Sequence, residues 1–199
     1  MSDQPGEGFA VSGAPPNPGC VSRRYPPRMR RHEHPNHARF LTFSCEHRLP
    51  LFDNDAIRDA FVDQLRRTRE RHALLLHAWV VMPEHVHLLI RCPGPATVPD
   101  VLRTLKTGLA KRVVTRWREL DAPVLAKITN ERRVARFWLR GGGYDRNVFS
   151  TKEIEEKIAY IHANPVRRGL VERPEDWAWS SARWWQGCRG DGLPCDQPA

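Results

Sequence analysis

Two histidines separated by one residue, His85 and His87, lie in an apolar stretch with the pattern of a β-strand. In a strand, alternate side chains share one face, so both imidazoles point the same way. Val86, Leu88 and Ile90 point to the other face and can pack on a core, which leaves the histidines facing outward. The strand rise separates the pair by about 7 Å, so the two rings can reach one metal ion. For either histidine alone, a solvated or hydrogen-bonded ring without a metal is the usual alternative.

A second group of candidate residues lies on a predicted helix near the end of the chain. Ser150 and Glu153 have the spacing of a capping box, which marks a helix start. Pro165 is expected to end this helix at Asn164. Its packing stripe consists of Ile154, Ile158 and Ile161.

Tyr160 lies about 120° around this helix from the isoleucine stripe. Asn164 is four residues further on and shares that flank, with Lys157 and Glu153 one turn earlier. The flank therefore offers a phenol and an amide that can be docked against the sheet face with the two imidazoles. The alternative for Tyr160 is a half-buried tyrosine that only packs.

Together these residue types have the chemistry for cleaving a phosphodiester. Such a reaction needs a cation at the scissile phosphate, a nucleophile held in line, and basic groups for the flanking strand. His85 and His87 could bind the cation, and Tyr160 could be the nucleophile. Asn164 could add an oxygen ligand, which suits Mg²⁺ or Mn²⁺ better than a purely nitrogen site does.

Hydrophobic periodicity predicts the elements that must position these residues. Residues 74–82 and 85–92 form an antiparallel hairpin that turns at Pro83 and Glu84. In an earlier strand Phe40, Thr42 and Ser44 share one face. Three glycines at 141–143 predict a flexible link. The predicted strands are 38–45, 74–82, 85–92 and 134–139, and the predicted helices run from 53 or 54 to about 71, from about 99 to 120, and from 150 to 164.

The helix at residues 99–120 has a strongly basic side. A charged helix face is usually only solvated, but nearly every charge here has one sign, which favours contact with nucleic acid. The basic residues are Arg103, Lys106, Lys111, Arg112, Arg116 and Arg118.

The composition limits the class of protein. The 199 residues have a formal charge of +9 at pH 7 and a pI of about 9.9, which favours a polyanionic partner, either nucleic acid or an anionic membrane surface. No apolar run reaches the roughly 18 residues that a membrane-spanning helix needs, and no signal-peptide pattern is present. The five cysteines are never spaced as a zinc pair, which favours reduced thiols in a cytoplasmic protein.

Both ends of the chain lack apolar periodicity. Residues 1–36 are rich in Pro, Gly and Arg and predict a disordered basic arm. Its arginines could follow a phosphate backbone or could simply be solvated. Residues 186–199 are expected to be a flexible tail, which leaves residues 37–185 as one folded domain. Arginines of the arm are Arg23, Arg24, Arg28, Arg30 and Arg31.

Two motifs resemble those of a known enzyme family. The hairpin Ala-Trp-Val-Val-Met-Pro-Glu-His-Val-His-Leu-Leu-Ile, residues 78–90, and the helix segment Tyr-Ile-His-Ala-Asn-Pro-Val-Arg-Arg-Gly-Leu-Val, residues 160–171, closely resemble the single-tyrosine transposases with a His-hydrophobic-His motif. Within that family the nearest branch is the REP-associated tyrosine transposases. Residues 141–143 depart from the pattern, because the family usually has bulkier residues there. Lesser matches are residues 43–52, Phe137-Trp138, Tyr144-Asp145-Arg146 and residues 175–181.

The resemblance implies an α+β domain of the ferredoxin-like or RRM-like type, an antiparallel sheet of about four or five strands with helices packed on one face. It implies Mg²⁺- or Mn²⁺-dependent cleavage of single-stranded DNA near a hairpin. Tyr160 matches the nucleophile, His85 and His87 match the metal ligands, and Asn164 matches the residue that completes the coordination. The implied product is a 5′-phosphotyrosine with a free 3′-hydroxyl, and a second 3′-hydroxyl reverses the step to join strands in transposition or repeat mobilisation.

The resemblance also implies the partner and the place of action. The expected partner is single-stranded DNA with a hairpin, bound by a monomer or homodimer in the bacterial cytoplasm, associated with the nucleoid and not with a membrane. One alternative is a domesticated protein that recognises hairpin DNA without turnover. An RNA-binding RRM-like module fits less well, because histidines stand where stacking aromatics would be needed. Candidate DNA-binding residues are Arg103, Lys106, Lys111, Arg112, Arg167 and Arg168.

Overall fold

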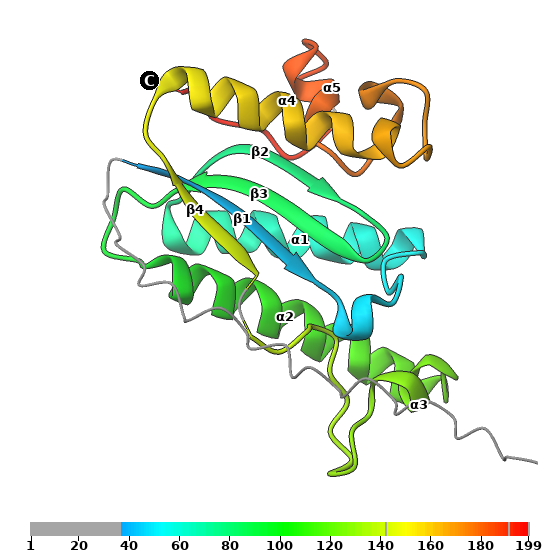
Figure 1. Cartoon of the computed structure of the whole chain (residues 1–199). Helices are drawn as coiled ribbons and strands as arrows, with labels where there is room; N and C mark the ends of the chain where they lie inside the picture. Colours follow the sequence, from blue (N-terminus) through cyan, green and yellow to red (C-terminus); the bar gives the residue numbers. More distant parts are fainter. Residues whose placement is uncertain (1–36, 142, 191, 199) are drawn as a thin grey trace, which may run out of the picture. The chain divides into compact units, whose positions relative to one another are not determined.

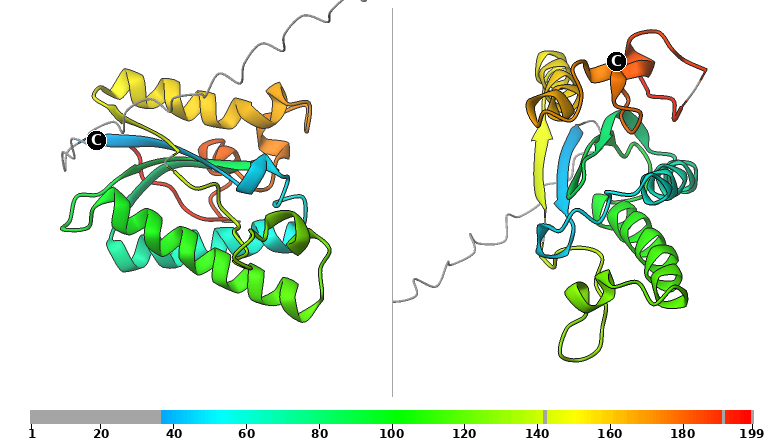
Figure 2. Two further views of the ribbon diagram at one scale, coloured as in Figure 1. Left: turned by 60° about the horizontal axis from the view of Figure 1, so that its bottom comes forward. Right: turned by 90° about the vertical axis from the view of Figure 1, so that its right-hand side faces the viewer.

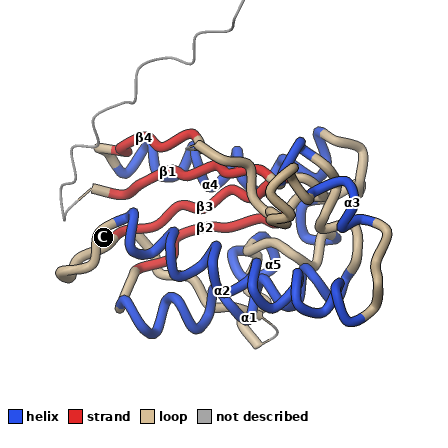
Figure 3. Tube along the Cα trace, turned by 90° about the horizontal axis from the view of Figure 1, so that it is seen from below, coloured by secondary structure: helices blue, strands red, loops and turns tan. Residues whose placement is uncertain are grey.

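The computed structural model describes residues 37–141, 143–190 and 192–198. Its centre is a four-stranded antiparallel sheet with the strand order β2-β3-β1-β4 (Figure 1, Figure 3). The predicted arm, residues 1–36, lies outside the described residues. The strands are β1 (Ala38–Ser44), β2 (Leu75–Val81), β3 (His85–Arg91) and β4 (Tyr144–Val148).

Helices lie on both sides of this sheet (Figure 2). The helices α1 (Asp55–His72) and α2 (Val98–Glu119) pack on one face, which confirms the predicted α+β fold with helices against an antiparallel sheet. Helix α4 (Thr151–Arg167) lies over part of the opposite face. No helix in the described ranges is long and apolar enough to cross a bilayer. The short helices are η1 (Glu46–Arg48), α3 (Val124–Ile128), η2 (Pro174–Asp176) and α5 (Ala182–Trp185).

The alternation along β3 decides which residues face each layer. Val86, Leu88 and Ile90 are fully buried in the core formed with α1 and α2. His85 and His87 alternate with these residues and therefore share the face that α4 covers. The predicted common face of the two histidines is confirmed. It is less open than expected, because only 5% of the surface of His87 is exposed.

The fourth strand differs from the prediction. Residues 134–139 form no strand and make only isolated bridges, for example between Trp138 and Cys45. Phe137 and Trp138 instead place their rings in the larger core. The fourth strand is Tyr144–Val148, which lies at the edge of the sheet and pairs only with β1. Because of this edge position its sequence is polar, and it lacks the apolar pattern by which a strand is predicted.

Gly143 allows β4 to approach β1 closely. A Cβ atom at this position would lie 1.5 Å from the backbone oxygen of Thr42, so no side chain fits there. Glycine in a strand often marks such a close backbone approach. The residue that precedes Tyr144 thus has a packing requirement, and this accounts for one glycine of the run that departs from the family pattern.

Helix α4 continues past the point where it was predicted to end. Pro165 lies inside the helix, which runs to Arg167. Proline removes the hydrogen bond to the carbonyl four residues earlier, but in the last turn this costs only one bond. The backbone oxygen of Asn164 accepts from Arg168 N–H at 3.1 Å. Asn164 is therefore held within the helix and not at its frayed end.

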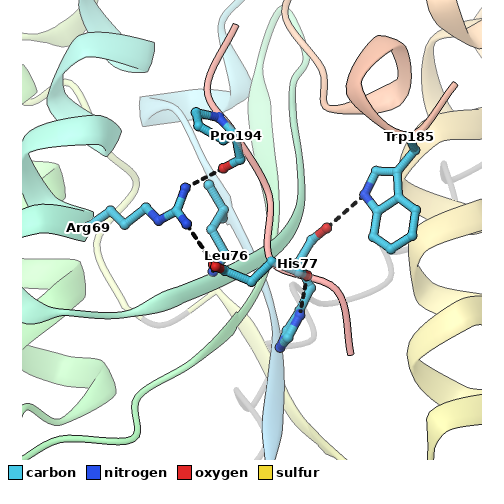
Figure 4. A network of polar contacts seen from close by, with 6 residues as sticks. Arg69, Leu76, His77, Trp185 and Pro194 are labelled. Carbon is cyan, nitrogen blue, oxygen red and sulfur yellow. Dashed lines mark hydrogen bonds and ion pairs between the residues drawn. The ribbon is translucent and has the colours of Figure 1, made fainter. Parts of the chain in front are cut away.

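Part of the expected flexible tail packs along the outer edge of β2 (Figure 4). Leu193 and Cys195 are buried in the larger core. The backbone N–H of Asp196 donates to the Leu76 oxygen at 2.7 Å, and its carboxylate accepts two bonds from Arg69 at 2.9 and 2.8 Å. These contacts fix residues 193–196 to the body and cover an edge strand that would otherwise expose unpaired backbone groups.

Candidate active site

The two histidines of β3 converge beneath α4. The ring centroids of His85 and His87 are 4.7 Å apart, and their Nε2 atoms are 3.1 Å apart. Two nitrogens bound at right angles to one ion, each about 2.1 Å from it, are about 3 Å apart. The separation of the Nε2 atoms is therefore that of two ligands of a single metal ion.

The other ring nitrogen of each histidine has an oxygen partner. Nδ1 of His87 is 2.7 Å from the hydroxyl of Thr42 on the neighbouring strand. Nδ1 of His85 is 3.2 Å from a carboxylate oxygen of Glu84, which also accepts from Arg168 at 2.9 Å. With a proton on each Nδ1, both Nε2 lone pairs face the space between the rings. Such outer contacts fix the orientation of metal-binding histidines.

Burial keeps both imidazoles neutral. Burial, and then the neighbouring His85, lower the pKa of His87 to about 3, although a hydrogen bond with Asn164 acts in the opposite direction. Burial also lowers the pKa of His85, against the carboxylate of Glu84, which raises it. Both rings are therefore neutral at pH 7, which is the form that binds metal ions.

Tyr160 is half-buried beside this pair, with 39% of its surface exposed. Its ring centroid is 5.6 Å from that of His87 and 5.8 Å from that of Phe40, both at steep angles. The ammonium of Lys157 and the guanidinium of Arg167 lie 5.8 and 5.5 Å from its ring centre. The predicted flank of α4 thus places a phenol next to the imidazoles and between two cations.

Asn164 is buried on the same flank of α4. Its amide nitrogen donates to the backbone oxygen of Tyr160 at 2.8 Å, which fixes the orientation of the amide. The side chain also lies close enough to His87 to raise the pKa of that imidazole, against the effect of burial. Because the nitrogen is used within the helix, the amide oxygen is the atom that remains for the histidine pair.

These groups fit a divalent cation only if the amide takes part. Among the described residues, no cluster of three or more His, Cys, Asp or Glu side chains could hold a metal ion. The set consists of two imidazole nitrogens and one amide oxygen, from His85, His87 and Asn164. Mg²⁺ and Mn²⁺ accept oxygen ligands and keep further positions for water or phosphate. The donor set and the nitrogen separation both fit such an ion.

The predicted DNA-binding residues fall into two places. Arg167 and Arg168 lie at the C-terminal end of α4, beside Tyr160 and Glu84. The residues predicted on α2 lie on the other side of the sheet from Tyr160 (Figure 1). Several already have intramolecular partners there: Arg103 contacts Asp100 at 3.1 Å, Arg112 contacts Asp63 at 3.6 Å, and the Lys106 ammonium lies 5.2 Å from the ring centre of Phe43, while Lys111 is exposed.

Thr42 is a site residue that the sequence did not single out. The alternation in β1 puts Thr42 on the same face as Phe40, but its contact with His87 depends on the pairing register of β1 and β3, in which Thr42 lies opposite His87. Register between strands distant in sequence has no local signature. The Glu84–Arg168 contact depends likewise on how α4 docks on the sheet.

His162 lies near Tyr160 in sequence but faces away from the site. Its Nε2 is 2.8 Å from the hydroxyl of Ser181 in a buried contact, and burial lowers its pKa to about 4 from an ordinary value of 6.5. Between these values the unfolded chain binds more protons than the folded one, so stability falls as the pH falls.

We expect wild type to lose about 2 kcal/mol from this residue between pH 7.5 and pH 5, and a His162→Gln variant to lose correspondingly less. Urea unfolding of both chains in metal-free buffer at the two pH values measures the difference. Because both chains share all the other titrating groups, equal losses in the two would refute this assignment.

Comparison with known proteins identifies the family. The family model described as Transposase IS200 like matches residues 36–164, more than half of the 199 residues. The chain therefore belongs to the IS200-like transposase family. Transposases of this kind are enzymes that cut and move DNA.

Individual relatives agree with the resemblance found in the sequence. The REP-associated tyrosine transposase of Escherichia coli (strain K12) is 26% identical over 120 residues, which cover 56% of this chain and 61% of that protein. A Haemophilus influenzae protein, named as a candidate REP-associated tyrosine transposase, is 25% identical over 142 residues, or 71% of this chain and 77% of that one. A solved REP-associated tyrosine transposase bound to a REP hairpin shares the fold, with a TM-score of 0.61 at 19% identity over 83% of this chain and 88% of that chain.

Proposed function

We propose that this chain cleaves and rejoins single-stranded, hairpin-associated DNA through a covalent 5′-phosphotyrosine at Tyr160, in DNA transposition or repeat mobilisation. The main support is that α4 places the Tyr160 ring 5.6 Å from His87, whose Nε2 is 3.1 Å from that of His85. A hairpin partner is supported by the solved relative, which is bound to a REP hairpin. We expect the chain to act as a monomer or homodimer at the nucleoid.

The residues have distinct roles in the proposed cleavage. The Tyr160 oxygen attacks the phosphorus, the bond from phosphorus to the 3′-oxygen breaks, and the leaving 3′-oxygen takes up a proton while the phenol loses one to solvent. Lys157 and Arg167, which lie against the Tyr160 ring, hold the phosphate backbone beside the phenol. Rejoining is the reverse reaction with another 3′-hydroxyl.

His85, His87 and Asn164 would hold a Mg²⁺ or Mn²⁺ ion, which supplies positive charge to the scissile phosphate when bound. Neighbouring residues of the chain fix the orientation of the two imidazoles. Thr42 and Glu84 hold the Nδ1 sides of the two rings, and Arg168 holds the carboxylate of Glu84. The contact between Glu84 and Arg168 also ties the hairpin of β2 and β3 to the end of the helix that carries Tyr160.

The direct test is detection of the covalent product. Purified protein is incubated with a pool of labelled single-stranded hairpin oligonucleotides and Mn²⁺, and the mass of the Tyr160 peptide is determined. We expect a peptide carrying a 5′-phosphorylated DNA fragment, together with a released fragment whose 3′-hydroxyl a polymerase can extend. Tight hairpin binding without an adduct in Mn²⁺ or Mg²⁺ would instead show a DNA-binding protein without turnover.

Thr42 gives a prediction for the metal site. Thr42→Val preserves the shape of the side chain but leaves Nδ1 of His87 without its 2.7 Å oxygen partner. Loss of such an outer partner typically weakens metal binding about 10- to 100-fold, and we expect an effect of this size on Mn²⁺ affinity measured by calorimetry. Thr42→Ser retains the hydroxyl and should bind Mn²⁺ nearly as wild type does. Equal affinities for the valine and serine variants would exclude a role for this contact.

A further inference from the structure

An exposed aromatic ring stands next to the candidate active site on the same face of the sheet. Tyr144 is the first residue of β4 and is 51% exposed. It lies directly opposite Thr42 in the pairing of β1 with β4, and Thr42 in turn lies opposite His87. Because residues opposite one another in a sheet share a face, Tyr144 is on the side of Thr42 and His87.

A row of rings connects Tyr144 to the site. Phe40 stacks on His87 at 5.5 Å with an angle of 16°, and Phe40 meets Tyr144 at 6.0 Å and Tyr160 at 5.8 Å, edge to face in both contacts. Phe40 is only 5% exposed, so it forms the floor of this row. Within the described residues no ring is stacked parallel on Tyr144, which leaves a ring face for another aromatic group.

The surroundings of Tyr144 are basic. Arg146, two residues further along β4, shares this face and has 48% of its side chain exposed, with Glu153 at 3.1 Å. Lys157 lies 5.3 Å from the ring centre of Phe40. A DNA strand with one phosphate at Tyr160 therefore lies beside cations between Tyr160 and Tyr144. The combination of a charged path and an open ring is the arrangement by which proteins hold single strands.

The backbone on both sides of Tyr144 is fixed. Gly143 packs directly against the backbone of Thr42. Asp145 points to the other face, where it forms a buried ion pair with Arg39 at 2.6 Å. The ring is thus carried on a rigid part of the strand, and stacking on it requires little further ordering of the protein.

We propose that Tyr144 is a stacking subsite for one unpaired nucleobase of the DNA strand, next to the phosphate that Tyr160 attacks. This proposal rests on the proposed function, because it takes its ligand from the strand bound there. A base within a duplex already has neighbours on both faces, whereas a single-stranded base offers a free face. Stacking accepts every base, so the subsite fixes the position of the strand more than its sequence.

The test uses hairpin oligonucleotides with 2-aminopurine at successive unpaired positions, since stacking on an aromatic ring quenches this base. All binding is measured in a Tyr160→Phe background, so that no covalent step contributes. We expect quenching at one position, its loss in Tyr144→Ala, and hairpin binding at least about 5-fold weaker in that variant. Tyr144→Phe should restore both quenching and affinity. Phe149→Ala is the matched control, because Phe149 is 65% exposed at the far end of β4 and should change neither.

The outcomes separate this proposal from the proposed function. If the adduct forms at Tyr160 but Tyr144→Ala leaves quenching and affinity unchanged, the subsite is wrong and the enzyme assignment stands. If quenching depends on Tyr144 but wild type forms no adduct, the subsite stands and the cleavage is wrong. If the chain binds no hairpin DNA, both fail. If Tyr144→Ala changes the melting temperature, the quenching measured with Tyr144→Phe decides the question. The subsite is refuted if the phenylalanine variant also loses quenching.

Discussion

Tyr160→Phe is expected to abolish the covalent protein–DNA adduct and to slow strand cleavage at least about 1,000-fold. Phenylalanine lacks only the hydroxyl. Its ring can keep the contacts with Phe40 and His87 and can still lie beside Lys157 and Arg167. Folding and hairpin binding should therefore persist while the nucleophile is missing. Denaturing gels of a labelled hairpin measure adduct and cleavage, and fluorescence anisotropy measures binding.

The control for this loss is another phenol of the same chain. Tyr25 lies outside the described residues, and Tyr25→Phe should leave the adduct yield unchanged. If Tyr160→Phe forms the adduct as wild type does, the nucleophile has been misassigned, and the mass of the adduct peptide would identify the residue that replaces it. If the variant loses hairpin binding as well, the lost adduct says nothing about chemistry, so the affinity is measured first.

Much of the site was predictable because its parts have local periodicity. The strand pattern put His85 and His87 on one face, and the helical pattern put Tyr160 and Asn164 on one flank. Both hold in the structure: the Nε2 atoms of the two histidines face one another, and Asn164 bonds back to the Tyr160 backbone. The hydrophobic period of a strand or helix depends only on the residues of that element. The face on which each of these side chains lies could therefore be predicted from the sequence.

The predictions that were wrong concern features that depend on contacts between elements. Tyr144 is half exposed because it lies at the edge of the sheet, a position that its own sequence segment does not reveal. The apolar pattern of residues 134–139 suggested a strand, but Phe137 and Trp138 fill the core from a segment without strand structure. A short apolar pattern indicates that residues are buried, but it does not by itself show that they pair with another strand. Pro165 is tolerated for a similar reason, since tertiary packing holds the last turn of α4.

The C-terminal tail, residues 186–199, contains another segment whose structure depends on contacts between elements. Its Gly- and Pro-rich composition favours disorder, and nothing in it has a period. Residues 193–196 are nevertheless held on β2. Leu193 and Cys195 are buried, and Asp196 bonds to Arg69 and Leu76. Such anchoring depends on contacts with residues that are distant in sequence, such as Arg69 and Leu76.

His87→Ala is expected to weaken Mn²⁺ binding more than about 100-fold and to reduce hairpin cleavage accordingly, because it removes one of the two facing Nε2 atoms outright. Hairpin binding through Lys157 and Arg167 should remain. The ring of His87 is also buried and stacked on Phe40 at 5.5 Å, so truncation costs about 1 to 3 kcal/mol of stability. Calorimetric titration with Mn²⁺ separates the two effects, because it is done below the melting temperature of each variant.

His87→Leu tests whether the loss is one of ligation, since leucine fills more of the space than alanine but carries no donor atom for a metal ion. His77→Gln is the matched control: His77 is buried on β2, with Nδ1 2.8 Å from the Asp196 oxygen and no part in the site. We expect His77→Gln to bind Mn²⁺ as wild type does and both His87 variants to bind it poorly. If both His87 variants titrate as wild type does, the ion is held elsewhere, and the 3.1 Å approach of the imidazoles is then a hydrogen bond between two neutral rings and not a pair of metal ligands.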